Sequence, residues 1–142
     1  MTRESLARSY RPMHGLVIAL SLFVASLAFT GASAAQSGEL AGTWSGGGFV
    51  SFASGQRERA RCRAQYSRMS RTSYALRATC ATASGRASQT ATLRYVGSNS
   101  YQGNFYNSEY DVSGTISVAV RGNRQFVRLS SGSGSATFEL RR

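Results

Sequence analysis

Strict alternation of side chains around two cysteines is the feature that most constrains what this chain folds into. Between residues 57 and 67 the chain alternates between two faces, and one of them carries Glu58, Ala60, Cys62, Ala64 and Tyr66. The pattern returns between residues 73 and 81, where one face carries Tyr74, Leu76, Ala78 and Cys80. A period of two residues predicts two strands, each buried on one face.

The two cysteines predict how these strands pair. If Cys62 lies opposite Cys80 in an antiparallel hairpin, the apolar positions of both strands coincide without a slip, as far as Tyr66 opposite Leu76. Directly opposed residues lie within disulfide reach, although an offset register stays open because bridges between neighbouring strands are often strained. Metal binding is the alternative, but two thiols without histidine make an incomplete zinc site. We therefore predict a Cys62–Cys80 disulfide, which would remove roughly 3 kcal/mol of unfolded-chain entropy.

Residues 1–34 have the pattern of a secretory signal peptide. Arg3, Arg8 and Arg11 precede an apolar run at residues 16–29, and small residues with an Ala-x-Ala pattern follow. The run is shorter than the ~20 apolar residues that span a bilayer, although an uncleaved N-terminal anchor is the alternative. We expect cleavage after Ala34, a periplasmic or secreted location, and a single domain over residues 35–142 without a transmembrane span. Cysteines of exported proteins normally pair, which supports the predicted disulfide.

The rest of the chain continues the alternation. Strands are expected at residues 42–52, 57–67, 73–81, 89–96, 101–106, 111–120 and 124–130, with a last one around residues 136–140. Eight short strands without a helical period predict an all-β protein, a small antiparallel up-and-down β-barrel with one disulfide. Because the chain is short, we expect side chains to fill the interior, with a ligand-holding cup as the alternative. Three consecutive glycines at residues 46–48 indicate a bend, a bulge or a close approach of two backbones.

The missing residue types argue against catalysis. All 17 basic residues are arginine, and His14 is the only histidine, so residues 35–142 contain neither lysine nor histidine. Catalytic triads, lysine Schiff bases and histidine-ligated zinc are therefore excluded there. A two-carboxylate glycosidase is formally possible with the few acids present, but we expect these acids to be surface charges. The sequence predicts no enzyme, no cofactor and no metal.

The segment Leu40-Ala41-Gly42-Thr43-Trp44 resembles the Gly-x-Trp opening of lipocalin-like (calycin) barrels. The resemblance implies that Trp44 closes one barrel end and that Arg141 or Arg142 packs over it. The same opening occurs in small periplasmic metalloprotease inhibitors, and the overall layout is similar to uncharacterised alphaproteobacterial periplasmic proteins. The motif of periplasmic lysozyme inhibitors needs a lysine that this chain lacks.

Arginines form a candidate anion-binding face. Arg57, Arg59, Arg61 and Arg63 share one face of their strand, and Arg77 is expected to face the same way on the next strand. Guanidinium groups suit phosphates and carboxylates, so candidate partners are lipopolysaccharide, acidic polysaccharide or an acidic face of an envelope or secreted protein. Nucleic acid is not expected because the chain is exported. The alternative is a charged face that only solubilises the sheet.

A second candidate surface lies at residues 101–110. It is rich in Tyr, Asn, Ser and Gly, which adaptable binding surfaces favour, and its candidate contacts are Tyr101, Phe105, Tyr106 and Tyr110. The alternative is that alternate aromatic residues face the core. Three hypotheses follow for the function: a non-catalytic envelope protein that recognises an anionic component, an inhibitor of a secreted protease or lysozyme, or a carrier of a small apolar ligand.

Overall fold

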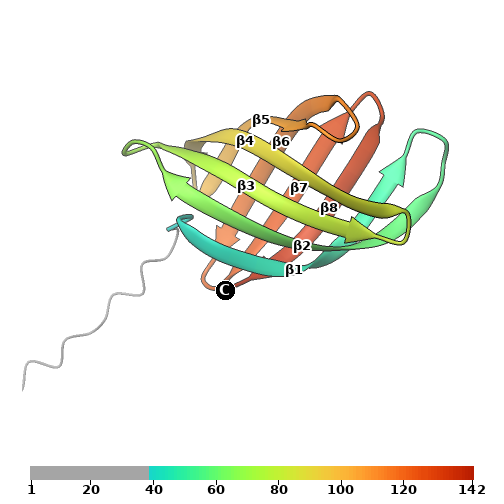
Figure 1. Cartoon of the computed structure of the whole chain (residues 1–142). Coiled ribbons are helices and arrows are strands. Elements are labelled where there is room, and N and C mark those ends of the chain that lie inside the picture. Colours follow the sequence, from blue (N-terminus) through green and yellow to red (C-terminus); the bar gives the residue numbers. More distant parts are fainter. Residues whose placement is uncertain (1–38) are drawn as a thin grey trace, which may run out of the picture. The chain divides into compact units, whose positions relative to one another are not determined.

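The computed structural model describes residues 39–142, and these residues form an eight-stranded sheet (Figure 1). The predicted signal peptide at residues 1–34 lies outside the described residues. The strands are β1 (Gly42–Phe52), β2 (Arg57–Arg68), β3 (Ser73–Thr82), β4 (Gly85–Gly97), β5 (Ser100–Asn107), β6 (Val112–Arg121), β7 (Arg124–Ser131) and β8 (Gly134–Arg141). No helix within this part of the chain is long and apolar enough to cross a membrane.

The sheet closes on itself. Each strand pairs antiparallel with the next, and β1 also pairs with β8, so none of the eight described strands is left at an edge. Figure 1 shows β1 beside both of these partners. Closure satisfies the backbone groups that an open sheet would leave unpaired. The predicted fold class, an all-β antiparallel up-and-down barrel with one disulfide, is confirmed.

The register of β2 and β3 is the one that the cysteines predict. Cys62 lies opposite Cys80, and Tyr66 lies opposite Leu76. The two cysteine Cα atoms are 4.1 Å apart and the sulfur atoms are bonded. The disulfide therefore joins neighbouring strands without any offset.

Strand β4 begins four residues earlier than the alternation predicts. The added residues, Gly85 to Ser88, carry no large apolar side chain and so give no periodic signal. They are strand because β3 continues opposite them, with Cys80 against Ala87 and Thr82 against Gly85. Pairing with a neighbour overrides the weak local preference here.

Close backbone approach explains two of the three consecutive glycines in β1. A β-carbon on Gly48 would overlap the carbonyl oxygen of Thr137, and one on Gly46 would overlap that of Glu139. Both positions face the barrel interior, where β1 meets β8. Gly47 faces outward and has more room. The triple glycine thus lies where the first and last strands, β1 and β8, pair and close the barrel.

Large side chains fill one end of the barrel. This end holds the start of β1 and the end of β8, together with the connections β2–β3, β4–β5 and β6–β7. Its fully buried side chains are Leu40, Trp44, Leu93, Val118 and Gln125. The opposite end has smaller inward-facing residues and is not filled.

Candidate functional site

The filled end is sealed by the segment that precedes β1. The Trp44 indole donates a hydrogen bond to the carbonyl of Leu40 at 3.0 Å, and both side chains are fully buried. The guanidinium of Arg142 lies 4.4 Å from the centre of the Trp44 ring and donates to the carbonyls of Glu39 and Ala41. A cation over an aromatic face is attracted by the ring quadrupole. Arg142 therefore fixes the sealing segment over Trp44.

Of the two arginines expected to close this end, Arg142 packs over Trp44 and Arg141 does not, so Arg141 is the wrong candidate. Its side chain points outward from β8, where the guanidinium contacts Glu139 at 3.2 Å. Side chains alternate along a strand, so Arg141 faces solvent because Leu140 faces the core. Arg142 lies just past the strand, where the chain is free to turn back over the barrel end.

Glu39 strengthens this seal. Its carboxylate accepts hydrogen bonds from the Ala41 amide at 3.0 Å and the Tyr74 hydroxyl at 3.2 Å, and it pairs with Arg68. Burial raises the pKa of Glu39, but the Ala41 hydrogen bond and the Arg68 charge outweigh burial and hold the pKa below its ordinary value. The carboxylate therefore stays ionised and ties three parts of the closed end together.

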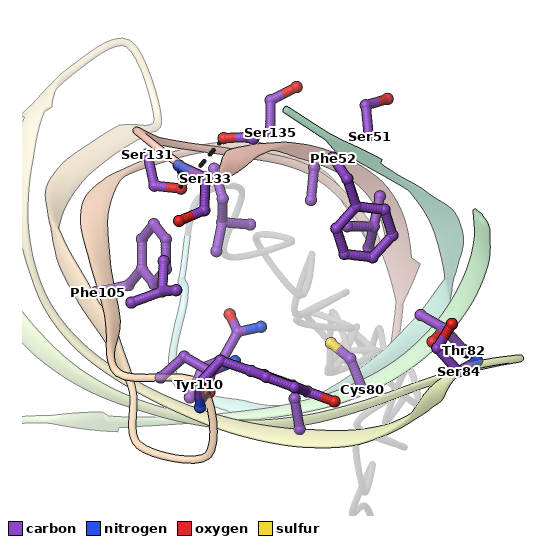
Figure 2. A pocket seen from close by; sticks show the side chains of 18 of the residues that line it. Ser51, Phe52, Cys80, Thr82, Ser84, Phe105, Tyr110, Ser131, Ser133 and Ser135 are labelled. Atoms are coloured by element: carbon purple, nitrogen blue, oxygen red, sulfur yellow. Dashed lines mark hydrogen bonds between the residues drawn. The ribbon is translucent and has the colours of Figure 1, made fainter. Parts of the chain in front are cut away.

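The opposite end of the barrel is an open cup of about 550 Å³. Figure 2 looks at this cavity, with Phe105, Tyr110 and Phe52 around it. The cavity exists because several inward-facing side chains here are small. Ala87, Ala136 and Cys80 are among the residues that line it. The expectation of a filled interior thus holds for one end only, and the alternative of a ligand-holding cup describes the other.

The walls of the cup are mainly apolar. Apolar residues on them are Val50, Ala87, Phe105, Val112, Leu129, Ala136 and Phe138. Three carboxamides also line the cup: Gln56 lies in the β1–β2 connection, whereas Gln89 and Asn107 lie directly opposite each other on β4 and β5. No carboxylate and no guanidinium of the described residues lines the cup.

The rim of the cup carries hydroxyl groups and two exposed aromatic rings. Its hydroxyl-bearing residues include Ser51, Ser54, Thr82, Ser84, Ser131, Ser133 and Ser135. Phe52 is 37% exposed and Tyr110 is 60% exposed. The Tyr110 hydroxyl would lie 3.5 Å from a β-carbon on Gly85, so the ring reaches from the β5–β6 connection to the start of β4. The mouth is therefore polar at its edge and aromatic beside the opening.

The structure divides the predicted partner-binding segment between the two faces of the sheet. Tyr101 and Phe105 are buried inside the barrel, whereas Tyr106 and Tyr110 are exposed. Tyr101 packs edge-on against Tyr74 at 5.3 Å between ring centres, in the closed end. Phe105 and Tyr110 line the cup. The four residues do not form one surface, because alternate aromatic residues face the interior.

The arginine ladder, defined as Arg57, Arg59, Arg61 and Arg63, lies exposed on the outer face of β2, and Arg77 is exposed on β3. The guanidinium groups of Arg57 and Arg59 lie 4.0 and 5.5 Å from the centre of the Phe49 ring on β1. None of these five arginines forms an ion pair with a described residue, since the ion pairs there involve Arg68, Arg124 and Arg141. The structure thus places all five on one uncompensated surface.

Sequence reasoning named Phe105 and Tyr110 as candidate contacts but missed the other residues of the cup. Gln89 shares the inward face of β4 with Ala91 and Leu93. A polar residue at such a core position is the signal in the sequence that could have identified it. Asn107 lies one residue beyond the predicted strand, and the serines of the rim lie in turns or at strand ends. No group of three metal-binding side chains comes together in residues 39–142.

Comparisons with known proteins show the fold and not a family. No protein family matches the sequence, and no curated protein matches it either. Among solved structures, the redesigned β-barrel mFAP1 bound to DFHBI matches with a TM-score of 0.62 and 12% identity, over 72% of this chain and 94% of that chain. A fluorescence-activating β-barrel designed de novo matches with a TM-score of 0.56 and 17% identity, over 72% and 92% of the two chains.

Proposed function

We propose that this protein is a non-catalytic binding protein whose cup holds a small, largely apolar ligand. The observation that carries the proposal is the cup of about 550 Å³, open at one barrel end and walled by apolar side chains. Small-molecule sites are concave and mostly apolar, with a few polar groups, and have volumes in this range. Trp44 and Arg142 close the other end of the barrel, so the cavity opens at one end only.

The similar designed barrels support this proposal. The mFAP1 and mFAP0 structures are both described as bound to DFHBI, and each matches 72% of this chain. A barrel of this architecture can therefore bind a small compound.

We also propose that the protein works after export, in the periplasm or outside the cell. The support is the signal-peptide pattern of residues 1–34, the disulfide and the resemblance of residues 40–44 to calycin barrels. The proposal that it is not an enzyme rests on the residue types of residues 35–142, which include no histidine or lysine to move a proton near neutral pH.

Ligand binding is tested with the neutral fluorescent probe Nile red and a variant that fills the cup. We expect Ala136→Phe to weaken Nile red binding at least tenfold, because Ala136 lines the cavity. The matched control is Thr137→Phe, which adds a ring to the outer face of the same strand and leaves the affinity unchanged. Organic extraction of protein purified from its native cell, followed by mass spectrometry, is expected to release a small molecule.

Two results count against a ligand-binding cup. One is an affinity for Nile red that both variants lower equally. The other is the absence of both probe binding and an extractable compound.

A second candidate function is recognition of an anionic envelope component by the arginine ladder and Arg77. Five exposed guanidinium groups without an ion-pair partner among the described residues favour it. Each group presents a planar fork that suits phosphate and carboxylate oxygens. Lipopolysaccharide and acidic polysaccharide carry such groups.

Chromatography on immobilised lipopolysaccharide and on an acidic polysaccharide tests this surface. We expect retention that falls as salt rises, and an early elution of the double variant Arg59→Ser/Arg61→Ser. The control is Arg86→Ser/Arg94→Ser, which removes the same charge from exposed positions on β4. Retention that the two double variants reduce equally would show that net charge alone is responsible.

A further inference from the structure

Two of the carboxamides that line the cup form a pair. Gln89 on β4 and Asn107 on β5 are directly opposed in the register, and both line the cup. Gln89 also lines a small space of about 20 Å³ that lies between the cup and the closed end, so its side chain stands at the level of the floor. A ligand that enters fully reaches this pair.

Both carboxamides keep hydrogen-bonding capacity for a ligand. The Asn107 oxygen accepts the Tyr110 amide at 3.1 Å, while its amide nitrogen has no partner among residues 39–142. The Gln89 side chain makes no hydrogen bond to any described residue. Asn107 is only 7% exposed, but it lines the open cup, so a ligand inside the cup can reach its amide nitrogen.

The remaining lining excludes charged ligands. Around the carboxamide pair stand Leu129, Ala136 and Phe138 from the opposite wall, and no acidic or basic side chain of the described residues lines the cup. An ion placed there would lose its hydration without gaining a counter-charge, which is strongly unfavourable. An uncharged carbonyl or amide, by contrast, would replace its hydrogen bonds to water with hydrogen bonds to the two carboxamides.

We propose that the cup selects an uncharged molecule with an apolar body and a carbonyl or amide end, and that this end hydrogen-bonds to Gln89 and Asn107 on the wall formed by β4 and β5. The apolar body contacts the walls, and the hydroxyl rim leaves the outer end in a polar setting, where the Glu58 carboxylate already accepts a hydrogen bond from the Ser84 amide at 3.3 Å. This inference rests on the proposed function, because it names the ligand chemistry of the same cavity.

Three probes with one ring system test the inference: 2-methylnaphthalene, 2-naphthamide and 2-naphthoate. Their affinities are measured by displacement of Nile red from the cup, so that binding elsewhere does not register. We expect 2-naphthamide to bind at least tenfold more tightly than either other probe. Gln89→Met keeps the length of the side chain and removes its hydrogen bonds, so it is expected to abolish the preference for the amide while 2-methylnaphthalene binds as before.

The control variant is Gln102→Met, because Gln102 is exposed on the outer face of β5. We expect it to leave all three affinities unchanged. Equal affinities for the three probes, or an amide preference that survives Gln89→Met, would overturn the inference and leave a ligand-binding cup intact. Tighter binding of 2-naphthoate would overturn the selection for uncharged ligands. If neither Nile red nor any probe binds, the proposed function itself fails.

Discussion

At the residue level, two inward-facing glycines let β1 and β8 approach closely. Gly46 and Gly48 face inward at the contact of β1 with β8, where the backbone of β8 occupies the place of a β-carbon. The sequence predicts a special role for the triple glycine, but it offers no way to tell a bend from a close approach. That distinction depends on which strand lies opposite, and β8 is about 90 residues away along the chain.

A comparison of neighbouring glycines tests this role. We expect Gly48→Ala to lower the free energy of unfolding by about 1–3 kcal/mol, because overpacking forces the backbones of β1 and β8 apart. Gly47→Ala is expected to be nearly neutral, since its β-carbon would meet only the Ala60 carbonyl at 3.3 Å. Urea denaturation of the two variants provides the measurement. Equal losses would contradict a close approach that is specific to the inward positions.

The last two arginines of the chain also differ in their expected contributions to stability. We expect Arg142→Ala to lower the free energy of unfolding by about 1 kcal/mol or more, because it removes the contact with Trp44 and the hydrogen bonds to Glu39 and Ala41. Arg141→Ala should change it by less than about 0.5 kcal/mol, as is usual for an exposed side chain. A larger loss with Arg141→Ala in urea denaturation would show that the assignment of the closing residue is wrong.

At the scale of elements, the alternation of side chains predicts most strands because each has one face in the core. The bounds of β1 agree with the prediction, and the β2–β3 register follows from the cysteines. The exception is the start of β4. Small residues face the cup there, so the sequence shows no alternation of apolar and polar residues. The element that the sequence describes least well is therefore the one that forms the wall of the site.

The disulfide joins two strands whose register their side chains already specify. We expect the double variant Cys62→Ala/Cys80→Ala to lose roughly 3 kcal/mol of stability, because the unfolded chain regains the entropy of an open loop. Circular dichroism of the folded variant should still be that of the same all-β barrel. An unchanged stability in urea would contradict the expected contribution of the crosslink, and a loss of the β-sheet spectrum would contradict a register set by side-chain alternation.

At the scale of the whole molecule, the barrel has one sealed end and one open end. The sequence predicts the sealed end, because Trp44 and its neighbours form a visible motif. It does not predict the open end. A cavity forms where small side chains from several strands lie at the same height along the barrel axis. That height depends on the registers of all eight strand pairs, which the sequence does not show. Asn107 lies within the candidate segment at residues 101–110, but its pairing with Gln89 emerges only from the register of β4 and β5.

Buried tyrosines make the sealed end sensitive to high pH. Burial raises the pKa of Tyr101 to about 12, and it raises the pKa of Tyr66 as well. In the unfolded chain tyrosine has a pKa of about 10, so the unfolded state releases its proton first. Stability from these residues is therefore fully present below about pH 10 and is lost as the pH rises toward about 12.

Denaturant titrations across this pH range check the prediction. We expect the free energy of unfolding to fall between about pH 10 and 12, and to fall less in the variant Tyr101→Phe. A stability that stays constant across this range would contradict the burial of these hydroxyl groups.

The central claim is that a small uncharged molecule binds inside the open end of the barrel. Nuclear magnetic resonance of the isotope-labelled protein, titrated with 2-naphthamide, tests it most directly because every backbone amide reports its own surroundings. We expect shifts at Ala87, Gln89, Asn107 and Ala136, with the amides of the arginine ladder unchanged. Shifts confined to the outer face of β2, or no shifts at all, would contradict it.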